Sequence, residues 1–216
     1  ERSVYIILRD FEQETCIILL LWAFSMLGMK VQQTLRERVL LERTLINISD
    51  GMSILPEDAR NYARTVQALP ERERQFLLPR ALLAGLHRFQ STNNIQDVAT
   101  TIKVTCDTEA DRMETELTIV RYIAWAIPSI GFLGTVRGIG TALGQAYQAV
   151  SGDIVGVTTS LGVAFNSTFV ALVVSILLMF VLHQLQLIQD RLVLDCQNYC
   201  DEKMLRHLQV PVRDAN

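Results

Sequence analysis

Three stretches of this chain are apolar almost throughout, and they predict its architecture. They cover residues 15–29, 119–145 and 154–182. At a rise of about 1.5 Å per residue the last two are long enough for a hydrocarbon core of about 30 Å, whereas the first covers about 22 Å and needs flanking residues to complete the crossing. Because backbone groups find no water inside a bilayer, we expect each stretch to form a transmembrane helix.

The segment 30–118 has a different pattern, with charges of both signs and several helix boundaries. Pro56 and Pro70 are each followed by acidic residues, which is typical of a helix start. We therefore expect helices over about 57–69 and 71–90, and after a break at 92–94 an amphipathic helix that leads into the second span. This segment is predicted to be a small cytoplasmic helical domain.

The distribution of positive charge predicts the topology. Basic residues follow the first span directly, at Lys30, Arg36, Arg38 and Arg43. The loop 146–153 contains no Lys or Arg, so by the positive-inside rule it is external. We accordingly expect 1–14 to be an external or interfacial segment and 183–216 to be a cytoplasmic C-terminal helix and tail. The predicted fold class is an all-α integral membrane protein.

Composition excludes several functions. A net charge near −3 with no basic face gives no support for nucleic-acid binding. The four cysteines form no Cys-x-x-Cys pair, so we expect free thiols and no metal or other cofactor. The glycine-rich stretch lacks the Gly-Lys-Ser/Thr of a P-loop, and no Ser/His/Asp cluster is evident. We therefore do not expect an enzyme.

The second span is unusually rich in glycine, which suits close helix packing in a membrane. Each glycine costs a soluble helix roughly 1 kcal/mol relative to alanine, but small residues let membrane helices approach closely. The residues expected to form a packed wall are Pro128, Gly131, Gly134 and Gly138.

Polar side chains form one layer near the middle of the second and third spans. Thr135 precedes Val150, the centre of the external loop, by about fifteen residues and Thr168 follows it by about eighteen, so their depths match. The complete layer comprises Thr135, Arg137, Asn166, Ser167 and Thr168. Membrane threonines often bond only to their own helix, but a pair at matched depth beside an arginine favours a functional role on an ion pathway.

Between Tyr122 and Leu182 the only acidic residue is Asp153, in the external loop, and Arg137 is the only basic residue; an arginine cannot release its proton. A proton pathway would therefore need a titrating group from another polypeptide, or water wires. Arg137 lies about 200° around the helix from Thr135, so the two need not face the same space. We expect Arg137 to contact Asn166 or an adjacent subunit, while Thr135 faces a pore.

Two motifs carry a family resemblance. Pro128-Ser-Ile-Gly-Phe-Leu-Gly-Thr-Val-Arg-Gly-Ile-Gly140 resembles the P-x-L-G-L-L-G-T-V-x-G-I core of the MotA/TolQ/ExbB proton-channel proteins. Ala164-Phe-Asn-Ser-Thr-Phe-Val-Ala-Leu172 resembles the third-helix motif of that family, A-x-x-x-T-x-x-G-L. A three-span topology with a cytoplasmic domain after the first helix is that of ExbB and TolQ.

The resemblance implies a homopentameric ring in the bacterial inner membrane, with the N-terminus periplasmic. The ring would surround a partner, expected as a dimer of ExbD-, TolR- or MotB-like single-span proteins, whose membrane aspartate takes and releases the ion. Family pore threonines map onto Thr135 and Thr168, and the second-helix proline maps onto Pro128. The function implied is an ion-driven motor or transport subunit in contact with membrane lipids.

The sequence departs from the ExbB and TolQ pattern at three positions. Val163 replaces a glutamate, Ala171 replaces a glycine, and Arg137 replaces an aromatic or apolar residue. These departures suit a divergent motor of the gliding or antiphage-defence kind. The alternatives are a membrane scaffold without ion conduction, and a sodium-driven unit in which Ser167 supplies a ligand oxygen.

Overall fold

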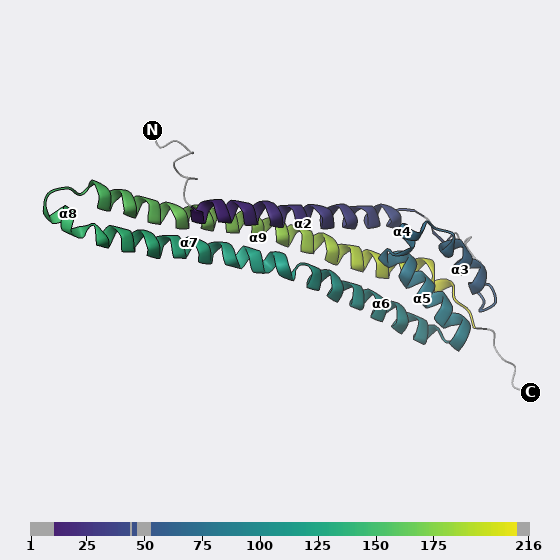
Figure 1. The fold of residues 1–216 in the computed structure, drawn as a ribbon. Coiled ribbons are helices and arrows are strands. Elements are labelled where there is room, and N and C mark those ends of the chain that lie inside the picture. Colours follow the sequence, from purple (N-terminus) through teal and green to yellow (C-terminus); the bar gives the residue numbers. More distant parts are fainter. Residues whose placement is uncertain (1–10, 44, 47–52, 211–216) are drawn as a thin grey trace, which may run out of the picture. The chain divides into compact units, whose positions relative to one another are not determined.

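The chain is helical over the residues that the computed structural model describes, which are 11–43, 45–46 and 53–210 (Figure 1). The helices are α2 (Phe11–Leu41), α3 (Ala59–Gln67), α4 (Glu71–Arg74), α5 (Leu77–Thr92), α6 (Ile95–Glu116), α7 (Thr118–Gly144), α8 (Ala146–Val150), α9 (Val155–Lys203) and the 3₁₀ turn η1 (Leu205–His207). Within these ranges the only β-type pairing is one parallel bridge between Ile54 and Leu208. The predicted all-α class is confirmed.

Three helical stretches of the described chain are long and apolar enough to cross a membrane: Phe11–Leu41, Ile95–Gly144 and Val155–His207. Each contains one of the expected spans almost completely. The first helix begins at Phe11, four residues before the apolar run, and α9 continues far beyond residue 182. Residues 1–10 of the expected external segment, and 211–216 of the expected tail, lie outside the described residues.

The chain divides into two compact units, and the boundaries between them fall within α2, between α6 and α7, and within α9. The first unit comprises Glu1–Lys30 and Leu117–Leu185. In its described part, α2 and α9 run antiparallel to α7 (Figure 1). This unit contains all the residues for which the sequence predicts a role in the pore or its wall.

The second unit comprises Val31–Glu116 and Gln186–Asn216. Its core is apolar and includes the fully buried Leu82, Leu86 and Phe89 of α5. The helix expected over 71–90 is divided into α4 and α5, because the backbone is extended at Phe76 (ψ 159°). The buried carboxylate of Glu37 accepts a hydrogen bond from the Leu77 backbone N–H at 3.2 Å, so a side chain of α2 satisfies one free donor at the start of α5.

All four cysteines are free and buried. Cys106, Cys196 and Cys200 belong to the apolar core of the second unit. Cys16 lies in the first unit, where its Sγ donates to the Ile127 carbonyl at 3.7 Å. Among the described residues, no group of three His, Cys, Asp or Glu side chains is arranged to hold a metal ion.

Candidate functional site: a polar layer across α2, α7 and α9

Helices α7 and α9 pack along a seam of small residues. A Cβ atom added to Gly131 would lie 2.5 Å from the Cβ of Ala171, and one added to Gly138 would lie 2.6 Å from the Cβ of Ala164. Between them, a Cβ on Gly134 would lie 2.9 Å from that of Ser167. These glycines are therefore required by contact distance, and the two helices pack as closely as small residues allow in a membrane.

Pro128 creates a second requirement at this interface. A proline has no N–H, so the carbonyl of Ala124, four residues earlier, loses its normal helical donor. The Ser175 hydroxyl of α9 donates to that carbonyl at 2.8 Å, and both residues are buried. A hydroxyl from a neighbouring helix is a recognised way of satisfying a carbonyl that a membrane proline leaves free.

The hydroxyl groups of Thr135 and Thr168 hydrogen-bond to each other. Each also lies within hydrogen-bond distance of a backbone carbonyl of the opposite helix: Thr135 Oγ1 is 3.1 Å from the Ala164 oxygen, and Thr168 Oγ1 is 3.0 Å from the Gly131 oxygen. Because each hydroxyl has one proton, one threonine donates to the other, which in turn donates to its carbonyl. We call Thr135 and Thr168 the threonine pair. It joins α7 to α9, and both side chains keep partial exposure.

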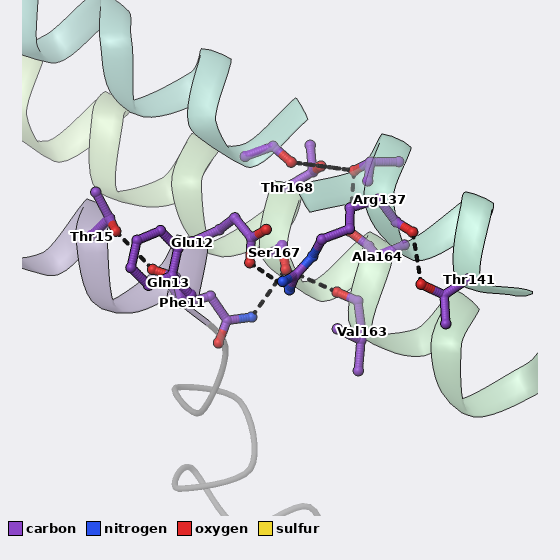
Figure 2. A network of polar contacts seen from close by, with 12 residues as sticks. Phe11, Glu12, Gln13, Thr15, Arg137, Thr141, Val163, Ala164, Ser167 and Thr168 are labelled. Carbon is purple, nitrogen blue, oxygen red and sulfur yellow. Dashed lines mark hydrogen bonds and ion pairs between the residues drawn. The ribbon is translucent and has the colours of Figure 1, made fainter. Parts of the chain in front are cut away.

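Arg137 is paired with a residue of α2 (Figure 2). Its Nη2 donates to Glu12 Oε2 at 2.7 Å, and the Glu12 side chain is only 11% exposed. The adjacent Gln13 donates through Nε2 to Ser167 Oγ at 3.4 Å, and Ser167 donates in turn to the Val163 carbonyl at 3.1 Å.

The sequence predicts a contact of Arg137 with Asn166 or with an adjacent subunit; within the described chain its partner is Glu12 instead of Asn166, and the contact with an adjacent subunit stays a prediction. No hydrogen bond of the described chain joins Arg137 to Asn166, and Asn166 is half-buried on α9. The physical reason is charge. A carboxylate gives the guanidinium a charge-assisted hydrogen bond, which is about twice as strong as the neutral bond that an amide would offer.

These two groups of polar side chains lie on opposite sides of the glycine seam. At about 100° per residue, Thr135 and Arg137 both flank the line through Gly131, Gly134 and Gly138, and they point about 200° apart. Arg137 faces α2, where Glu12 lies, whereas Thr135 contacts α9 on the other side. The polar layer predicted from sequence is thus two separate sites.

The threonine pair has a chemistry suited to proton exchange. Either hydroxyl can act as the donor in the bond between them, and each has a backbone carbonyl as a second acceptor. A hydroxyl group can donate one hydrogen bond and accept two, so the pair can also bind a carboxyl group or a water molecule. Neither threonine can itself carry a charge at neutral pH.

Sequence reasoning missed the contributions of Glu12 and Ser175, although signals for both were present. An arginine within a membrane span needs a counter-charge, and the charged residues just ahead of the first span include Glu12. A proline inside a span leaves a free carbonyl, and Ser175 is a hydroxyl residue on the facing helix. Neither partner is close to its counterpart in the sequence, so local patterns could not identify it.

The fold and this site define a helical membrane protein with polar side chains at close helix–helix contacts within its spans. The model of the MotA/TolQ/ExbB proton channel family matches residues 73–198, which is more than half of the chain. The chain belongs to this family, whose members are channel and transport proteins rather than enzymes. Comparisons with curated proteins and with solved structures gave no match.

Proposed function

We propose that this chain is a wall subunit of a proton channel that couples the proton motive force to mechanical work through a single-span partner with a membrane carboxylate. Family membership supports ion conduction, and the threonine pair is the observation that carries the assignment to residues. Thr135 lies nine residues before the end of α7 at Gly144, about 14 Å at the helical rise and close to half of a 30 Å hydrocarbon core.

The need for a partner follows from the charges in the spans. In the described part of the first unit, the carboxylate in this polar layer is that of Glu12, and it is engaged by Arg137 on the side of the seam away from the threonines. Glu12 is therefore not placed to exchange a proton with the threonine pair. The carboxylate that loads and releases the proton therefore comes from a second polypeptide, and Thr135 and Thr168 hydrogen-bond it or its waters.

The assembly follows the same logic. Many large apolar side chains of α7 and α9 are exposed in the single chain, including Phe132, Leu133, Phe165 and Phe169. We propose that five copies form a ring in the bacterial inner membrane, with α7 and α9 around the partner helices and lipid outside. Native mass spectrometry of the purified complex tests this stoichiometry by counting chains.

The direct test removes the two hydroxyls and keeps the side-chain shape. In liposomes holding the chain and its partner, Thr135→Val with Thr168→Val is expected to reduce proton uptake at least tenfold. Thr141→Val is the matched control, because the Thr141 hydroxyl bonds only to the Arg137 carbonyl of its own helix. Thr→Ser replacements at both positions keep the hydroxyls and are expected to keep most of the flux.

Three outcomes would contradict parts of the proposal. Undiminished flux in the double valine variant would exclude the threonine pair from the ion pathway. Work and flux that follow a sodium gradient instead of a pH gradient would identify the sodium-driven alternative. A purified complex that conducts no ion, and contains no partner with a membrane carboxylate, would identify a scaffold.

A further inference from the structure

Arg137 carries a permanent positive charge in the apolar part of α7. Its side chain is 57% exposed in the single chain, and because arginine keeps its proton in proteins, it cannot adapt to a membrane span by becoming neutral. The structure provides one carboxylate in ion-pair contact with it among the described residues, that of Glu12, and the 2.7 Å contact is in the range of a charge-assisted hydrogen bond.

The geometry of the helices brings these two side chains together. The Cα–Cβ bonds of a helix lean toward its N-terminus. Because α2 and α7 are antiparallel, Glu12 and Arg137 lean in opposite directions and meet between the helices (Figure 2). The Glu12 side chain passes directly over Gly134, since a Cβ at that position would be in van der Waals contact with Glu12 Cγ, at 3.4 Å. The Glu12 side chain thus packs against α7, the helix that carries Arg137.

We propose that Glu12 is the dedicated counter-ion of Arg137, and that its charge is what makes this arginine tolerable in the membrane unit. The role is electrostatic and positional. It holds the start of α2 against α7, with the Gln13–Ser167 hydrogen bond beside it. It does not include ion transfer, because the pair is separated from the threonine pair by the glycine seam.

This role predicts an asymmetry between the two partners. Glu12→Gln leaves a guanidinium that cannot discharge, whereas Arg137→Gln leaves a carboxyl group that can take up a proton and become neutral. The first change should therefore damage the protein and the second should be mild. Changing both residues to glutamine removes both charges and should restore stability.

The experiment measures the thermal stability of the assembled protein after detergent extraction, by size-exclusion chromatography of a fluorescent fusion. Glu12→Gln is expected to lower the melting temperature by about 5 °C or more. Arg137→Gln and the Glu12→Gln/Arg137→Gln double variant are expected to stay within about 2 °C of the parent. Glu14→Gln is the matched control, because Glu14 is a neighbouring acid that is exposed on α2.

A charge exchange, Glu12→Arg with Arg137→Glu, keeps the pair and is expected to give assembled protein. If Glu12→Gln prevents assembly altogether, the double glutamine variant must restore it. A double variant as unstable as Glu12→Gln would overturn the proposal, because a carboxylate would then be needed for a reason other than the charge of Arg137. Equal damage from Glu12→Gln and Arg137→Gln would overturn it as well. Neither result depends on whether the channel conducts protons.

Discussion

The Ser175 hydroxyl is predicted to matter only because Pro128 stands opposite it. The Ala124 carbonyl has no helical N–H donor, because position 128 is a proline, and its donor in the parent protein is the Ser175 hydroxyl at 2.8 Å. Ser175→Ala removes this hydroxyl and leaves the carbonyl without a donor. Ala124 is 2% exposed, so water does not replace the lost bond. An unsatisfied buried acceptor costs about 1–3 kcal/mol. For a chain of this size, each kcal/mol corresponds to a shift of about 2–4 °C in the melting temperature.

The matched control is Ser175→Ala made in a protein that already carries Pro128→Ala. Alanine at position 128 restores an N–H that bonds to the Ala124 carbonyl, so Ser175→Ala should then have little effect. Melting temperatures of the four proteins form a double-mutant cycle, in which we expect a coupling energy of about 1–2 kcal/mol between Pro128 and Ser175. Equal destabilisation by Ser175→Ala in both backgrounds would refute this assignment.

Two further predictions concern the packing of the separate units. Gly131→Ala places a Cβ 2.5 Å from that of Ala171 and should destabilise the first unit by about 1–3 kcal/mol in thermal melts. Gly140→Ala is the control and should be neutral, because a Cβ at position 140 has nothing within 4 Å. Adding Ala171→Gly to Gly131→Ala should recover stability, and no recovery would place the clash elsewhere. In the second unit, Arg80→Met removes the 2.6 Å partner of the 9% exposed Glu109 and leaves it only the 3.7 Å ion pair with Arg112, which should cost about 1–3 kcal/mol. Arg80→Met with Glu109→Leu should cost less, and an equal or larger loss in the double variant would argue against this pair.

The positions of the spans could be predicted from the sequence because each one depends on a local property. The apolar run over 119–145 matches α7 within one residue at each end, and the charge at Lys30 marks the end of the first run. The matched depth of Thr135 and Thr168 was also predictable, since it requires only a helical rise and a shared loop.

The features that sequence could not supply are contacts between distant residues. Glu12 and Arg137 are 125 positions apart, and the expectation that Asn166 would contact Arg137 came from nearness in depth alone. The division of the predicted helix 71–90 has a similar cause. Its break at Phe76 brings the Leu77 N–H to the Glu37 carboxylate, an interaction that no local pattern contains.

Proton flux through the purified chain, measured with and without its single-span partner, addresses the proposed mechanism most directly. Liposomes with an internal pH indicator would contain this chain alone, or the chain together with the partner. We predict flux only when the partner is present, and its loss when the partner's membrane carboxylate is changed to an amide. Flux of equal size from the chain alone would show that it carries a proton-conducting group of its own, and would contradict the proposed dependence on the partner's carboxylate.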